Sequence, residues 1–271
     1  MTSNAKTPRV AFVTGAARGI GAETVRTLCH QGYQVIAVDS CAESCTGRPD
    51  GVDYPLASRG ELDRLGEEFP DQILTRVADV RDQDALARAA ADGVAAFGRI
   101  DVVVAAAAVI VGGKPLWETP ASHLDTLWDV DVRGVWNTAT VCIPHLLEGP
   151  DPSRGRFVAI ASAASARGLF HLAGYNVAKH AVVGLVKGLA ADLVGTGVTA
   201  TAVSPGSTRT RMLAATAALY ELGEVDEFAS SQLIRRLITT TEIAATVAFC
   251  CSIEGAVLNG SVVSADGGFG A

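Results

Sequence analysis

The chain has 271 residues, of which 49% are hydrophobic and 19% are charged, and its formal net charge is −7. This acidic balance argues against non-specific binding to nucleic acids and to anionic membranes, because both need positive charge clustered on one face. The polar start of the chain has no apolar signal core, and no later stretch reaches the roughly 20 apolar residues of a membrane span. We therefore expect a cytoplasmic protein without a nucleic-acid or membrane partner.

Short apolar runs rich in Val, Ile and Ala alternate with longer helical patterns along the chain. Strands are predicted at residues 9–14, 33–38, 73–78, 101–105, 156–161, 198–203 and 261–265. Helices are predicted from the turn at 15–21 toward Gly32, and at 61–69, 83–97, 123–147 and 173–193. This order predicts a single α/β domain over residues 1–271 with a Rossmann fold, in which helices cover both faces of a doubly wound, seven-stranded parallel sheet.

The first strand leads into the sequence Thr-Gly-Ala-Ala-Arg-Gly-Ile-Gly at 14–21, which places three glycines at a strand-to-helix turn. Glycines there let backbone N–H groups and the helix dipole approach a pyrophosphate. A tight turn without a ligand is the alternative, but an acid at the end of the next strand favours a dinucleotide. The cofactor-binding residues expected here are Gly15, Ala17, Arg18, Gly19, Ile20 and Gly21.

Asp39 closes the second strand, near the position where a carboxylate accepts hydrogen bonds from the adenosine ribose. A carboxylate there also repels a 2′-phosphate, whereas the cation of Arg18 beside the turn could hold one. We give Asp39 more weight and expect NAD (NADH) as the cofactor. After the third strand, Asp79 and Val80 are expected beside the adenine, although an Asp after a strand is often only a helix cap.

The second strand is followed by a segment at 40–60 that is rich in Gly, Pro, Ser and Asp. It is longer than the few residues usual between a strand and a helix, so we interpret it as an insertion that has a function.

Six cysteines lie scattered along the chain, without a paired metal-ligand spacing: Cys29, Cys41, Cys45, Cys142, Cys250 and Cys251. Reduced thiols are expected in a chain without an export signal. Cys41 and Cys45 lack the second pair or the histidines that would complete four ligands, so no metal site is predicted.

Ser162, Tyr175 and Lys179 form a second constellation, after the fifth strand and in the helix that follows it. Tyr175 and Lys179 share one helix face because they are four residues apart. An ammonium there is expected to lower the tyrosine pKa from about 10, so that Tyr175 acts as a base on an alcohol and as an acid on a carbonyl. Ser162 would bind the substrate oxygen, and Lys179 the nicotinamide ribose. Each residue alone also has an ordinary structural interpretation.

In order and position, the turn at 14–21, the Ser162/Tyr175/Lys179 set and Pro205-Gly206 after the sixth strand resemble the short-chain dehydrogenase/reductase superfamily. The resemblance covers nearly the whole chain. It implies that Pro205 and Gly206 lie beside the cofactor, that Thr208 contacts the nicotinamide carboxamide, and that Thr210 caps the next segment. It also implies a substrate lid at about 207–240 and a homotetramer built partly on the helices at 123–147 and 173–193.

More narrowly, the chain resembles the mycofactocin-coupled branch of that superfamily. The matching features are Ala37-Val38-Asp39 and the insertion that contains Tyr54-Pro-Leu-Ala-Ser-Arg-Gly-Glu-Leu62. This resemblance implies a tightly held NAD that is re-oxidised in place by an external redox carrier, mycofactocin. The alternative is an ordinary dehydrogenase with exchangeable NAD, whose insertion is only a surface loop.

The chain departs from the superfamily pattern at two places. Ala106-Ala107-Ala108 replaces Asn-Ala-Gly after the fourth strand, although Ala106 and Ala107 are still expected beside the cofactor. Asp131 replaces an Asn that serves as the fourth catalytic residue. A carboxylate there could hold a water beside Lys179, or pair with Lys179 and weaken its effect on Tyr175. These departures are the best argument for a rival hypothesis, a catalytically weak NAD-binding scaffold.

The substrate is expected to be an apolar secondary alcohol or ketone. The predicted lid carries six large apolar or aromatic side chains: Met212, Leu213, Leu219, Tyr220, Leu222 and Phe228. An amphipathic helix that merely packs on its own domain would show the same pattern. Phe170 and His171, between Ser162 and Tyr175, are further candidates for the pocket.

Overall fold

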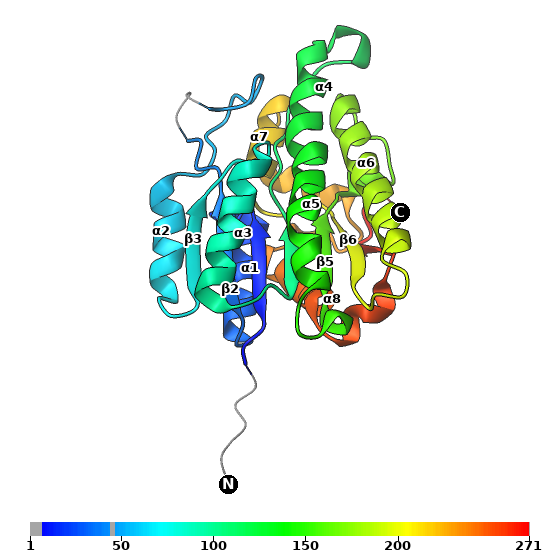
Figure 1. Cartoon of the computed structure of the whole chain (residues 1–271). Coiled ribbons are helices and arrows are strands. Elements are labelled where there is room, and N and C mark those ends of the chain that lie inside the picture. Colours follow the sequence, from blue (N-terminus) through cyan, green and yellow to red (C-terminus); the bar gives the residue numbers. More distant parts are fainter. Residues whose placement is uncertain (1–6, 44–46, 271) are drawn as a thin grey trace.

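Seven strands form one parallel sheet in the computed structural model, which describes residues 7–43 and 47–270. The strand order is β3-β2-β1-β4-β5-β6-β7, as predicted for a doubly wound sheet (Figure 1). The strands are β1 Val10–Thr14, β2 Gln34–Asp39, β3 Ile73–Val77, β4 Val102–Ala105, β5 Arg156–Ile160, β6 Thr199–Pro205 and β7 Val262–Ala265.

Helices cover both faces of the sheet because successive side chains of each strand point to opposite sides. Val10 and Phe12 pack into a core with α3 (Gln83–Phe97), α5 (Gly134–Leu147) and α6 (Ala173–Asp192). Ala11 and Val13 pack into a second core with α1, α2 and α8. The bounds of these helices are α1 Gly19–His30, α2 Arg59–Glu68 and α8 Thr240–Cys251.

The edge formed by the carboxyl ends of the strands contains the point where the strand order reverses, between β1 and β4. Ligands bind at such switch points because the loops on either side turn in opposite directions and leave a crevice. The turn after β1 and the loops after β4, β5 and β6 all open at this edge. Two further elements follow β6 there, α7 (Arg211–Leu219) and a 3-10 helix at Val225–Ser231.

The helix predicted at 123–147 is interrupted in the structure. It consists of α4 (Ala121–Leu127), a π-helical segment at Trp128–Arg133, and α5. The sequence pattern did not indicate the wider turn, because side-chain periodicity does not distinguish one inserted residue from regular helix. The π-helical segment contains Asp131 and so determines where this carboxylate points.

Helix α8 was not predicted, and this is the main error in the expected element order. Apolar residues occupy most sides of the helix, so its periodicity is weak. A local signal was nevertheless present, because Thr239 and Glu242 form a capping box at its start. Among the described residues, no helix is long and apolar enough to cross a membrane.

Candidate active site

A single cavity of about 810 Å³ follows the carboxyl edge of the sheet, within the size range of cofactor and ligand pockets. It is lined by most of the predicted site residues: Gly15, Arg18, Gly19, Ile20, Gly21, Asp39, Asp79, Val80, Ala106, Ala107, Ser162, Tyr175, Lys179, Pro205, Gly206, Thr208 and Thr210. Two predicted residues, Ala17 and Asp131, are buried and are not among the lining residues. The cavity therefore brings the glycine turn and the Ser/Tyr/Lys set into one space.

The glycine turn needs glycine where the backbone comes close to other segments. Gly15 has φ +65°, and a Cβ added there would lie 2.7 Å from the Ala107 Cα. A Cβ on Gly21 would lie 2.0 Å from the Gly15 carbonyl oxygen. The Ala106 N–H donates to the Thr14 hydroxyl at 3.2 Å, so this hydroxyl cross-links β1 and the segment after β4 without the missing amide. Backbone therefore forms this wall of the cavity, as phosphate binding requires.

Asp39 lies at the end of β2 and is 8% exposed. Its carboxylate accepts hydrogen bonds from the N–H groups of Ala17 at 3.1 Å and Cys41 at 3.0 Å. Burial raises the pKa of Asp39 above its ordinary value, although these N–H groups and the Arg18 cation act in the opposite direction. Ala17 thus contributes by tying the glycine turn to Asp39.

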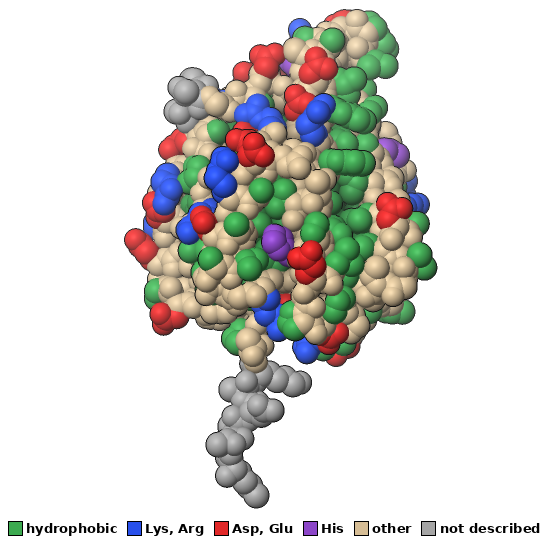
Figure 2. Space-filling model, viewed as in Figure 1, with side chains coloured by type: hydrophobic (Ala, Val, Ile, Leu, Met, Phe, Trp, Pro, Cys, Tyr) green, Lys and Arg blue, Asp and Glu red, His purple; other side chains and the backbone are tan. Residues whose placement is uncertain are grey.

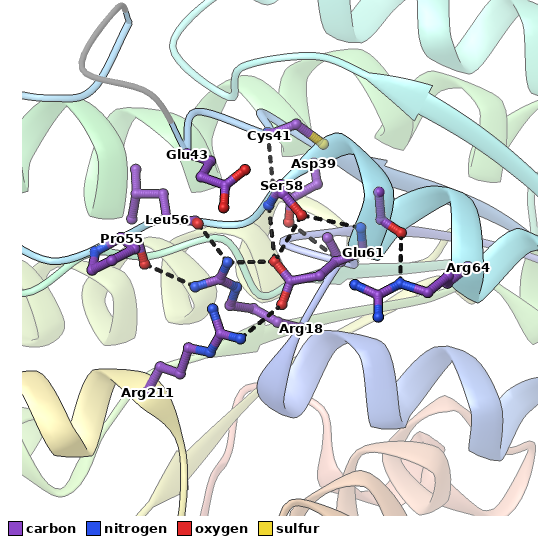
Figure 3. A network of polar contacts seen from close by, with 12 residues as sticks. Arg18, Asp39, Cys41, Glu43, Pro55, Leu56, Ser58, Glu61, Arg64 and Arg211 are labelled. Atoms are coloured by element: carbon purple, nitrogen blue, oxygen red, sulfur yellow. Dashed lines mark hydrogen bonds and ion pairs between the residues drawn. The ribbon is translucent and has the colours of Figure 1, made fainter.

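Arg18 leaves the glycine turn and reaches the insertion. Its two terminal nitrogens donate to the carbonyls of Pro55 and Leu56, and Nη2 also lies 2.5 Å from Glu61 Oε2 (Figure 3). The second carboxylate oxygen of Glu61 is 3.4 Å from the Arg211 guanidinium at the start of α7. Sequence reasoning did not find this network, because its members are brought together by the path of the insertion.

At the expected adenine end, Asp79 does not cap a helix. It holds the Arg81 guanidinium at 2.6 Å, while Asp82 caps α3. The Val80 carbonyl accepts a hydrogen bond from the Asn137 amide at 2.9 Å. Asn137, for which the sequence indicated no role, thus holds the loop after β3 in place through this hydrogen bond.

Tyr175 and Lys179 point from α6 toward the loop after β5. Lys179 Nζ lies 5.5 Å from the centroid of the Tyr175 ring and donates to the Ile160 carbonyl at 3.4 Å. Ser162 caps the short 3-10 helix Ala163–Ser165, where its hydroxyl accepts the Ala164 N–H at 3.1 Å. The predicted spacing thus places the three side chains around one end of the cavity.

The pKa of Tyr175 is raised, which corrects the expectation of an acidic phenol in the protein without bound cofactor. Burial raises it most, the Lys179 ammonium lowers it, the Asp131 carboxylate raises it, and a hydrogen bond with Ser162 lowers it. The cation is present as expected, but desolvation and the nearby carboxylate outweigh it.

Asp131 forms a direct ion pair with Lys179, with Oδ2 3.0 Å from Nζ. The two side chains are 0% and 2% exposed, and Asp131 Oδ1 accepts the Val109 N–H at 2.9 Å. Burial raises the pKa of Asp131, against the Lys179 cation. Burial lowers the pKa of Lys179, but Asp131 and Tyr175 raise it more, so the lysine keeps its proton at neutral pH. The expected pairing of Asp131 with Lys179 is therefore present.

The insertion reaches into the cavity through Tyr54. The Tyr54 hydroxyl accepts the Ile110 N–H at 3.0 Å, and burial raises its pKa. Val52 and Ala57 on either side are buried, and the Asp50 carbonyl accepts a hydrogen bond from Thr126 of α4 at 2.9 Å. The insertion therefore packs on the domain. The sequence motif contained Tyr54, but nothing in it indicated this contact.

Aromatic side chains also line the cavity. Phe170, Tyr220 and Phe228 line it, together with Met212 and Leu213 of α7. The Tyr220 hydroxyl donates to the Phe170 carbonyl at 2.5 Å, and the rings of Tyr220 and Phe228 are 6.0 Å apart. The remaining candidates, Leu219, Leu222 and His171, are not among the lining residues.

Thr208 and Thr210 lead from β6 into α7. Thr208 is buried, and its hydroxyl donates to the Gly206 carbonyl at 3.0 Å. Thr210 caps α7, as expected, by accepting the Leu213 N–H at 3.1 Å.

The described cysteines are Cys29, Cys41, Cys142, Cys250 and Cys251, and all five are free. Cys45 lies outside the described residues. Within residues 7–43 and 47–270, no group of three His, Cys, Asp or Glu side chains is placed to hold a metal.

The chain is similar in sequence and in fold to known oxidoreductases. Residues 15–270 match the family described as "Enoyl-(Acyl carrier protein) reductase". An uncharacterized NAD-dependent oxidoreductase of Mycobacterium tuberculosis is 32% identical over 268 residues, which is 96% of this chain and 95% of that protein. The (−)-trans-carveol dehydrogenase of Rhodococcus erythropolis is 32% identical over 208 residues, 76% of this chain and 73% of the enzyme. The crystal structure of carveol dehydrogenase from Mycobacterium avium in complex with NAD has a TM-score of 0.88 and 27% identity, and the match covers 97% of this chain and 98% of that one.

Proposed function

Since this chain belongs to the short-chain dehydrogenase/reductase superfamily, we propose that it is an NAD(H)-dependent oxidoreductase that interconverts a secondary alcohol and a ketone. One observation carries the proposal. A single cavity joins the glycine turn and Asp39 to Ser162, Tyr175 and Lys179, so a bound dinucleotide and a proton-transfer group share one space.

The residues present fit NAD. The close backbone at Gly15 and Gly21 suits a pyrophosphate, and Asp39 suits the adenosine ribose. Asp79 and Val80 would flank the adenine. Pro205, Gly206 and Thr208 would hold the nicotinamide end, with Lys179 at its ribose. When bound, the nicotinamide supplies the acceptor or donor of the hydride.

Tyr175 moves the proton in this mechanism. The Ser162 hydroxyl holds the substrate oxygen. The Tyr175 hydroxyl gives a proton to that oxygen during ketone reduction, and the Tyr175 phenolate takes the proton from it during alcohol oxidation. The Lys179 ammonium favours the phenolate, as does the positive charge of an oxidised nicotinamide when it is bound. Asp131 pairs with Lys179, and its charge raises the pKa of Tyr175, so we treat it as a positioning residue.

Three aromatic side chains that line the cavity support the proposed substrate class. Phe170, Tyr220 and Phe228 suit an apolar alcohol or ketone, and the carveol dehydrogenases similar to this chain are consistent with a cyclic one. The segment at about 207–240, with α7 and Phe228, would act as the substrate lid.

A tightly held NAD, re-oxidised by an external carrier such as mycofactocin, is the narrower proposal. The packing of the insertion supports it, since Tyr54 lines the cavity and accepts the Ile110 N–H, and Val52 and Ala57 are buried against the domain. An exchangeable NAD would instead need this insertion to open rapidly.

A homotetramer in the cytoplasm completes the proposal. Hydrophobic side chains gather along α4 and α5 in Figure 2, and the exposed ones there include Leu124, Trp128, Trp136 and Leu147. An apolar surface of this kind typically marks a protein interface. Light scattering after gel filtration would give the mass of four chains, and a monomer mass would contradict this assignment.

The proposed function is tested by screening secondary alcohols with an artificial electron acceptor and, separately, with free NAD as acceptor. Protein purified without added nucleotide should carry NAD or NADH, identified after denaturation, and should oxidise an apolar alcohol faster with the artificial acceptor. An empty preparation that turns over rapidly with free NAD would favour the exchangeable enzyme. Bound nucleotide without turnover of any alcohol would favour the scaffold, the candidate that the Asp131–Lys179 pair supports.

A further inference from the structure

Two guanidinium groups lie near the adenosine end of the proposed NAD site. Arg18 belongs to the glycine turn and Arg211 begins α7, and both line the cavity with Asp39. Guanidinium groups bind phosphates well because their N–H donors match phosphate oxygens. From these cations alone, the site would attract the 2′-phosphate of NADP.

The donors of Arg18 are directed to the insertion. Nη1 donates to the Pro55 carbonyl at 2.8 Å, and Nη2 is shared by the Leu56 carbonyl and the Glu61 carboxylate (Figure 3). The Arg18 and Glu61 side chains are only 21% and 17% exposed. Both terminal nitrogens are therefore engaged within the protein.

Glu61 is fixed in place independently of Arg18. It forms a capping box with Ser58 at the start of α2, in which Oε2 accepts the Ser58 N–H at 2.9 Å. Its other oxygen faces Arg211 at 3.4 Å. Burial raises the pKa of Glu61, but the Ser58 N–H and Arg18 together lower it more, so the carboxylate is charged at neutral pH.

We propose that Glu61 is a cofactor-specificity residue, which selects NAD by withholding Arg18 from a 2′-phosphate and by placing a negative charge beside Arg211. This inference rests on the proposed dinucleotide site. Glu61 also adds a second negative charge near Asp39. The two carboxylates are close enough for the charge of Glu61 to raise the pKa of Asp39. Selection then has two parts: Asp39 repels the phosphate, and Glu61 occupies Arg18, the cation that would attract it.

The test is a competition between the two cofactors. Purified protein is equilibrated with equal concentrations of NAD⁺ and NADP⁺ until the bound ratio is constant, passed through a desalting column and denatured, and the released nucleotides are quantified. In Glu61→Gln, the glutamine keeps the capping box but lacks the charge. The NADP-to-NAD ratio should rise about tenfold, as expected when a charged phosphate gains one guanidinium partner.

Two variants sharpen the result. Asp63→Asn makes the same charge change two residues away, at an exposed pair with Arg59, and should leave the ratio unchanged. Arg18→Ala combined with Glu61→Gln should lose most of the tenfold gain.

The outcomes separate this inference from the proposed function. A wild-type protein that binds neither dinucleotide would overturn both. Binding of NAD with a ratio in Glu61→Gln within about twofold of the wild-type ratio, a difference of well under 1 kcal/mol, would overturn the role of Glu61 and leave the oxidoreductase standing. A tenfold gain that survives when Arg18→Ala is combined with Glu61→Gln would also overturn it, since Arg18 would then not be the cation that Glu61 withholds.

Discussion

Two ion pairs join the sequence motifs of this protein to other segments, and they differ in their access to water. At the proton-transfer end, Asp131 and Lys179 are 0% and 2% exposed. At the adenosine end, Glu61 and Arg18 are 17% and 21% exposed, and backbone carbonyls of the insertion share the guanidinium (Figure 3). In each pair the cation belongs to a sequence motif, Lys179 to the Ser162/Tyr175/Lys179 set and Arg18 to the glycine turn. The carboxylate comes from a different segment of the chain.

This difference in exposure separates two effects of a charged side chain. A buried charge changes the pKa of the groups that transfer protons, whereas a partly exposed charge affects the binding of a charged ligand. Without water, each charge depends on its partner, and the removal of one partner is costly and changes the pKa of neighbouring groups. With water nearby, the same kind of pair contributes little to folding. The effect we propose for it is on which charged ligand the site accepts. Four predictions test this contrast, from the largest expected effect to the smallest.

Asp131→Ala should destabilise the fold by about 3–5 kcal/mol, because it leaves the Lys179 ammonium buried without a counter-charge. The variant also removes the acceptor for the Val109 N–H. Urea unfolding followed by circular dichroism measures the change. Asp131→Asn is the matched control, since its amide oxygen can still accept that N–H, and it should lose less stability. A loss below about 1 kcal/mol in Asp131→Ala would show that the pair is not isolated from water.

Asp131→Asn should move the pH dependence of alcohol oxidation to lower pH. The Asp131 carboxylate raises the pKa of Tyr175, so its removal lowers that pKa and increases the fraction of phenolate, the form that accepts a proton. Below the pKa, each unit changes the phenolate fraction about tenfold, so the rate at neutral pH should rise severalfold. Single-turnover rates across pH measure the shift. A shift to higher pH would mean that Lys179 loses its proton when Asp131 is neutralised, contrary to the mechanism.

Glu61→Ala should cost about 1 kcal/mol, because it removes one half of the α2 capping box and a partly exposed ion pair. Glu61→Gln should cost less, because it keeps the cap. Thermal unfolding of both variants tests this. A cost as large as that of Asp131→Ala would remove the distinction between the two pairs.

Asp63→Asn should change stability by at most about 0.5 kcal/mol, since Asp63 and Arg59 form an exposed pair one helical turn apart. The same thermal measurement applies. A larger loss would show that α2 depends on its surface charges, and Asp63→Asn would then be a poor control for Glu61.

Local patterns predicted most of the fold and the membership of the site. The glycine turn, Asp39 and the Ser162/Tyr175/Lys179 set could be located because strand and helix periodicity places them at one edge of a parallel sheet. Helix α8 was missed because its apolar residues are not confined to one face. Its capping box was the available signal.

The missing parts of the site depend on contacts between distant segments. The Arg18–Glu61 pair spans 43 positions, and Tyr54 meets Ile110 across 56 positions. The sign of the Tyr175 pKa shift was also out of reach, because it depends on how completely the residue is buried. The four-residue spacing predicted that the Lys179 cation lies near Tyr175. It could not predict that desolvation raises the pKa of Tyr175 more than this cation lowers it.

The measurement that tests the central claim most directly is single-turnover hydride transfer in Tyr175→Phe, with bound nucleotide quantified in the same preparation. The phenyl ring keeps the packing on α6 but cannot exchange a proton with the substrate oxygen. We predict retained NAD and a loss of hydride transfer of about 10²-fold to 10⁴-fold, the usual contribution of a positioned acid or base. Wild-type rates in a variant that still holds its nucleotide would contradict the assignment of Tyr175 as the proton-transfer residue.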